Sequence, residues 1–146
     1  MSRSIAKILA LFITDTNKNL IRCDRLEVDE KGVVGDKHYN TSPRTRSVLI
    51  TSTKAYDLLS NEGIEASFGS LGENIVIDYD LHRLNPGDRL QAGDAVVEIT
   101  QNCTLCNHLA TIDKRVPRLL RHDRGIFAKV VTSGTLRQND EVYLLS

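Results

Sequence analysis

The fold class is decided by residues 85–100, NPGDRLQAGDAVVEIT. Asn85-Pro86-Gly87-Asp88 predicts a tight turn, and Gln91-Ala92-Gly93-Asp94 predicts a second one, because these residues favour turn backbone conformations. Arg89 and Leu90 between the two turns are expected to be short and extended. Ala95–Thr100 then predicts a strand.

The same pattern of short apolar runs between turn residues continues along the chain. One helix is expected over Lys54–Ser60, with Ser52 or Thr53 as its N-cap. The segment 114–123 is either a short helix beginning at Pro117 or a lid loop. Further strands are expected over Ile5–Thr14, where a helix is the alternative, and over Arg25–Val28, Ser47–Thr51, Ile75–Ile77, Ile126–Val131 and Val142–Leu145. We therefore expect a mostly β protein, a barrel or sandwich with one or two short helices, forming a single domain over residues 1–146.

Composition excludes several classes of function. The 19 Lys and Arg residues balance the 19 Asp and Glu residues, so net charge does not indicate nucleic acid binding. Trp is absent and aromatics make up 5%, which argues against a base-stacking surface. The run Ile8–Ile13 is far shorter than the ~20 residues that cross a bilayer, and no signal peptide is evident. We expect a cytoplasmic protein without membrane contact.

Cysteines supply the clearest chemical signal. The chain has three, Cys23, Cys103 and Cys106, and an odd number does not indicate a disulfide framework. In a reducing cytosol they are expected to be free thiols, metal ligands or catalytic groups. Cys103 and Cys106 are spaced so that both thiols can converge on one atom, and His108 can orient or deprotonate a thiol.

Three other interpretations of this pair stay open. A structural zinc site needs about four ligands, and only Cys23 and scattered histidines remain to complete it. A thioredoxin-like redox site requires a βαβ context that the pattern does not offer. The simplest alternative is that both cysteines are small buried side chains that fill a core. A c-type haem site is excluded because Asn107 separates Cys106 from His108.

Three polar clusters are further candidates for a binding site. Residues 32–38, GVVGDKH, combine two glycines that can expose backbone N–H groups to an anion with Asp36 and His38, although a turn with a solvated tail is the simpler interpretation. Arg44 and Arg46 can clamp a phosphate or carboxylate, or can simply be solvated. Glu73 and Asn74 are expected to hold a loop through side-chain-to-backbone hydrogen bonds.

Taken in order, these segments resemble the MOSC family, named for the C-terminal domain of molybdenum cofactor sulfurases. The resemblance extends from about Leu26 to Leu145. Many family members carry Arg-x-Pro-Cys after the strand that ends at Thr100, whereas this chain has Cys103-Thr104-Leu105-Cys106, which is similar to small stand-alone members. The matching segments are Gly32–His38, Arg46–Ile50, Leu71–Ile75, Asn85–Asp88, Gly93–Thr100, Arg124–Val130 and Asn139–Val142.

The resemblance implies a β-barrel-like MOSC fold and a role in handling sulfur or the molybdenum cofactor. Cys106 aligns with the family cysteine, which carries a persulfide or ligates molybdenum, and Cys103 would be a second or resolving thiol. The remaining candidate residues for cofactor binding are Asp36, His38, Arg46, Glu73, Asn74 and His108. The implied partner is a cysteine desulfurase or another molybdopterin-pathway protein. Pyridoxal phosphate is associated with the family through a desulfurase domain that this chain lacks.

Two rival hypotheses make different predictions. The domain can be a non-catalytic binding module for a molybdopterin-pathway partner, in which case Cys103 and Cys106 should not react with a thiol reagent in the native protein. It can also be a zinc-stabilised fold, in which case pure protein should contain stoichiometric zinc and unfold with a chelator.

Overall fold

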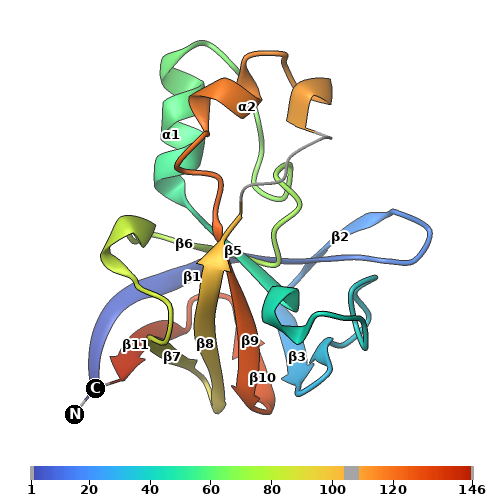
Figure 1. Cartoon of the computed structure of the whole chain (residues 1–146), viewed down its shortest axis with the longest axis vertical. Coiled ribbons are helices and arrows are strands. Elements are labelled where there is room, and N and C mark those ends of the chain that lie inside the picture. Colours follow the sequence, from blue (N-terminus) through green and yellow to red (C-terminus); the bar gives the residue numbers. More distant parts are fainter. Residues whose placement is uncertain (1, 104–108, 146) are drawn as a thin grey trace.

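The computed structural model describes residues 2–103 and 109–145 and consists mainly of short strands, as Figure 1 shows. Seven strands close into a barrel in the order β11-β7-β8-β9-β5-β6-β1, because β11 also pairs with β1. These strands are β1 (Ser2–Thr14), β5 (Val48–Ser52), β6 (Ile75–Ile77), β7 (Arg89–Ala92), β8 (Ala95–Asn102), β9 (Ile126–Thr132) and β11 (Glu141–Leu145). The expected mostly β fold is confirmed.

Four further strands lie outside the closed ring. The strand β2 (Leu20–Cys23) pairs with the second half of β1 and forms a hairpin that projects from the barrel. A small separate sheet has the order β10-β3-β4, from Gly134–Arg137, Arg25–Asp29 and Gly32–Val33. Of these four strands only β3 was expected.

The alternation in β8 explains why this sequence forms a barrel. Ala95, Val97 and Ile99 are buried, and the residues between them are half-buried, so one face of the strand fills the barrel interior. The turn before β8 requires Gly93, which has a φ of +57°. A Cβ atom at Gly93 would lie 2.3 Å from the carbonyl oxygen of Thr135, so no other residue fits this turn.

Helical segments cover one end of the barrel (Figure 1). The helix α1 (Thr53–Asn61) extends the expected helix by one residue at each end, and α2 (Val116–Leu119) forms within the segment 114–123, with Pro117 in its first turn. A second apolar core lies between them and includes Leu59, Leu71 and Val116. The 3-10 segments are η1 (Arg44–Arg46), η2 (Leu81–Arg83) and η3 (Leu109–Thr111). Within the described part of the chain, no helix combines the length and the apolar character needed to cross a bilayer.

Asn74, directly before β6, joins three strands of the barrel. Its backbone N–H donates to the carbonyl of Leu49 and its carbonyl accepts from the N–H of Phe12. Its side chain bonds to the same two residues, with donor and acceptor exchanged. Oδ1 accepts from the N–H of Leu49 at 3.0 Å, and Nδ2 donates to the carbonyl of Phe12 at 3.2 Å. One buried residue therefore satisfies both backbone groups of Phe12 in β1 and of Leu49 in β5.

We expect Asn74→Ala to lower the free energy of unfolding by about 2–4 kcal/mol, because two buried backbone groups and Asp36 lose their partner. Urea unfolding followed by circular dichroism measures this change. Asn61→Ala, at the exposed last residue of α1, is the matched control and should change stability by less than about 0.5 kcal/mol. Equal effects of the two substitutions would contradict the role given to Asn74.

Candidate functional site

A cavity of about 780 Å³ lies beside the barrel and contains most of the described candidate residues. It is bounded by the β1–β2 hairpin, by the segment from Asp36 to Arg46, by the loop from Gly69 to Asn74, and by the chain around Cys103 and Arg124. Its lining residues are Thr14, Lys18, Leu20, Asp36, Lys37, His38, Thr41, Ser42, Pro43, Arg46, Leu49, Gly69, Ser70, Gly72, Asn74, Cys103, Arg124 and Phe127.

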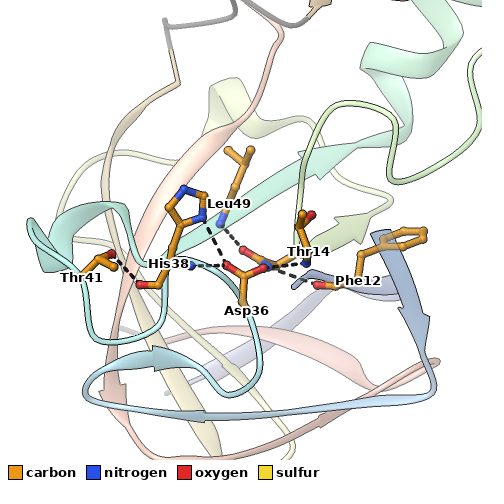
Figure 2. A network of polar contacts seen from close by, with 7 residues as sticks. Phe12, Thr14, Asp36, His38, Thr41 and Leu49 are labelled. Carbon is orange, nitrogen blue, oxygen red and sulfur yellow. Dashed lines mark hydrogen bonds and ion pairs between the residues drawn. The ribbon is translucent and has the colours of Figure 1, made fainter. Parts of the chain in front are cut away.

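Asp36 is the buried anchor of one wall of the cavity (Figure 2). Its Oδ1 accepts from the N–H of Thr14 at 2.9 Å and from Nδ2 of Asn74 at 3.3 Å, and its Oδ2 accepts from the N–H of His38 at 3.1 Å. Burial acts to raise the pKa of Asp36, but hydrogen bonds from His38 and Thr14 outweigh burial and hold this pKa below its ordinary value. Asp36 is therefore a carboxylate at neutral pH.

His38 extends from this anchor to the rim of the cavity. Its Nδ1 lies 3.2 Å from Oδ2 of Asp36, and its side chain is 58% exposed. Thr41 closes the turn by donating its hydroxyl to the carbonyl of His38 at 2.6 Å. The backbone and one ring nitrogen are thus fixed, and Figure 2 shows the other ring nitrogen directed away from Asp36.

The two arginines of η1 have separate roles. Arg44 donates to Oδ1 of Asn40 at 2.9 Å and to the carbonyl of Thr41 at 3.1 Å, so its guanidinium holds the preceding loop. Arg46 lines the cavity instead, with its guanidinium carbon 5.8 Å from the centre of the Phe127 ring. Of the two arginines, Arg46 is therefore the one that lines the cavity.

Arg124 is the site residue that sequence reasoning missed. It is separated from the start of β9 by one residue, Gly125, lines the cavity and is only 4% exposed. Its Nε and Nη1 atoms are buried and make no hydrogen bond, and no ion pair is found for it in residues 2–103 and 109–145. A buried guanidinium is normally paired, so these donors indicate a place for an anion. The only indication in the sequence was that Arg124 stands before a glycine that leads into an expected strand.

Cys103 brings sulfur chemistry to the same cavity. It follows β8 directly, its backbone N–H donates to the carbonyl of Gly125 at 2.9 Å, and its side chain is buried. This bond places Cys103 beside the chain that carries Arg124. A cysteine in this position can act as a nucleophile or as a metal ligand in its thiolate form.

The charged groups of the cavity are mostly positive. Asp36 is the one carboxylate among the described lining residues, and it is already fully hydrogen-bonded. The cationic lining residues are Lys18, Lys37, Arg46 and Arg124. Such a set attracts an anion rather than a metal cation by itself.

Glu73 does not line the cavity but supports one of its loops. Its buried Oε2 accepts from Oγ1 of Thr51 at 2.7 Å and from the hydroxyl of Tyr56. Burial, followed by the charge of Glu73, raises the pKa of Tyr56 far above its ordinary value, so the phenol keeps its proton. The same hydroxyl accepts from the N–H of Gly69 at 3.1 Å, which connects Glu73 to the lining loop.

The structure thus brings Asp36, His38, Arg46, Asn74 and Cys103 to one cavity, with Glu73 behind it. Cys106 and His108 lie outside the described residues, so their predicted roles and the convergence of the two cysteines stay predictions. No group of three or more His, Cys, Asp and Glu side chains suited to a metal ion occurs in the described ranges.

Comparisons with known proteins agree with this architecture. A family model described as the MOSC domain matches residues 33–143, whereas no curated protein matches. The solved YuaD protein from Bacillus subtilis has a TM-score of 0.84 at 20% identity, covering 99% of this chain and 98% of that one. YiiM from Escherichia coli has a TM-score of 0.75 at 18% identity, covering 96% of this chain and 70% of that one. At these identities the two structures show a shared fold.

We expect Arg124→Met to raise the free energy of unfolding by about 1 kcal/mol in a buffer with chloride as its only anion, because it removes unpaired buried donors while keeping an apolar stem. Urea unfolding measures the change, and Arg118→Met, at an exposed position of α2, is the control with little effect. A loss of more than about 1 kcal/mol would mean that the fold itself satisfies Arg124.

Proposed function

Because the chain belongs to the MOSC domain family, we propose that its cavity holds the molybdenum cofactor, with a cysteine thiolate on the metal side and Arg124 on the phosphate side. The observation that carries this proposal is the buried, unpartnered guanidinium of Arg124 in the same cavity as Cys103. The phosphate of molybdopterin is an anion that such a group binds strongly.

The residues present fit this group. Arg124 offers two buried N–H donors without a partner among the described residues, and the cavity of about 780 Å³ falls within the size range of ligand pockets. Lys18 and Lys37 line the same cavity and add positive charge. Cys103, and Cys106 by resemblance, supply soft thiolate ligands of the kind that prefer metals such as molybdenum over hard cations.

Each residue would make a distinct contribution to binding. Arg124 binds and orients the phosphate, and Asp36 with Asn74 keeps the opposite wall in place. The ring of Phe127 and the guanidinium of Arg46 form a stacked pair that can cover a planar ring system. When bound, the cofactor would supply the redox and atom-transfer chemistry of the metal, which the protein cannot supply by itself.

Sulfur carriage is the second candidate function, and the presence of Cys103 in the lining of the cavity supports it. A thiolate of this chain would attack the terminal sulfur of a cysteine desulfurase persulfide. The new S–S bond forms on this chain, the S–S bond of the desulfurase breaks, and the desulfurase cysteine leaves as a thiolate. By resemblance Cys106 is the residue that accepts the sulfur, and Cys103 is the second thiol.

To test both functions, the chain is purified from cells that make the cofactor, and bound pterin is measured by fluorescence after oxidation. We expect wild type and Arg118→Met to retain pterin, and Arg124→Met to retain about 10- to 100-fold less, because a charged hydrogen bond contributes about 1.5–3 kcal/mol. Cys106→Ser and Cys103→Ser should lose the metal more readily than the pterin.

Incubation of the pterin-free chain with a cysteine desulfurase and cysteine tests the second function. A gain of one sulfur in the native mass, lost in Cys106→Ser, would establish a carrier. A chain that neither retains pterin nor gains sulfur would refute both functions.

A further inference from the structure

The Asp36–His38 pair engages one ring nitrogen of a histidine that lines the cavity. Because Asp36 is a carboxylate, it accepts a hydrogen bond, so the neutral His38 ring carries its hydrogen on Nδ1 at 3.2 Å from Oδ2. The Nε2 atom is then an acceptor in the neutral ring and a donor in the protonated ring. Figure 2 shows Nε2 pointing away from Asp36.

The charged groups that share the cavity with His38 are mostly cations. Asp36 is bonded to one nitrogen of the His38 ring, and four cationic side chains line the same cavity. Those cations are Lys18, Lys37, Arg46 and Arg124, and the thiol of Cys103 is the other titratable group of the lining. A dianion in the cavity would offset these cations, and the balance would then shift toward the protonated ring.

We infer that His38 takes up a proton when a tetrahedral oxyanion enters the cavity, and that Nε2 donates this proton to the anion in a hydrogen bond. The proton comes from solvent, an N–H bond forms on Nε2, and no electron moves. This proposal rests on the anion site assigned to Arg124 and adds to it a second, pH-dependent contact. The pair would make the cavity bind oxyanions more tightly in mildly acidic solution.

Isothermal titration of the full chain with inorganic sulfate tests the proposal, because sulfate stays a dianion from about pH 5.5 to about pH 8.5, the range in which histidine changes charge. We expect the association constant to rise as pH falls, by up to about tenfold per pH unit. Titrations in buffers of different ionisation enthalpy should show uptake of close to one proton per sulfate. His38→Gln should bind sulfate with an association constant that no longer depends on pH.

The chain offers a matched control in His82. Its Nε2 lies 2.7 Å from Oδ1 of Asp123 and its side chain is 51% exposed, but it lines a different and much smaller pocket. His82→Gln should therefore keep the pH dependence of the wild type. A pH dependence that survives in His38→Gln, or disappears in His82→Gln, would refute the proposal.

Nuclear magnetic resonance of the wild-type chain provides a test that needs no variant. Nitrogen-15 spectra should show the neutral His38 ring with its hydrogen on Nδ1, and sulfate at constant pH should increase the protonated fraction. Sulfate binding without this increase would refute proton uptake alone. Failure of sulfate to bind at every pH would refute the anion site of Arg124 and the present proposal together.

Discussion

The four hydrogen bonds between Asn74 and the backbones of Phe12 and Leu49 are the constraint on which the barrel and the cavity both depend. β6 has only three residues, so its backbone can form only a short ladder of hydrogen bonds to β1 and β5. The Asn74 side chain lengthens that ladder by one step beyond the strand. Its Nδ2 also reaches Asp36, and in this way the position of the cavity wall follows from the register of the barrel.

The cavity and the loop support behind it contain groups that a purely structural core would avoid. Buried side-chain donors and acceptors are nearly always paired, because an unpaired one costs about 1–3 kcal/mol. Arg124 and Oε1 of Glu73 depart from this rule. The apolar core of the barrel stabilises the fold. The protein can therefore stay folded despite the free-energy cost of the unpaired groups of Arg124 and Glu73.

Sequence patterns were sufficient for the barrel but only partly for the site. Turn residues such as Gly93 mark the ends of the barrel strands, so the positions of those strands could be predicted within a few residues. Asp36 and His38 were expected only as members of one candidate cluster, and the hydrogen bonds between them are a finding of the structure. The burial of Arg124 could not be predicted, because it depends on how the chain before β9 packs in the tertiary structure, where Gly125 lies against the carbonyl of Ile50. The different partners of Arg44 and Arg46 likewise depend on tertiary contacts with Asn40 and Phe127.

The pairing of β1 with β11 also has a consequence for how the chain folds. Ser2 lies opposite Leu145, so strands from the two ends of the chain must meet before the barrel can close. Contacts between residues far apart in the sequence form slowly, because closing the long loop between them costs conformational entropy. During synthesis the early strands must therefore wait for the last one to leave the ribosome. In that interval β1 presents an unpaired edge, and folding in the cell competes with association of that edge with other chains.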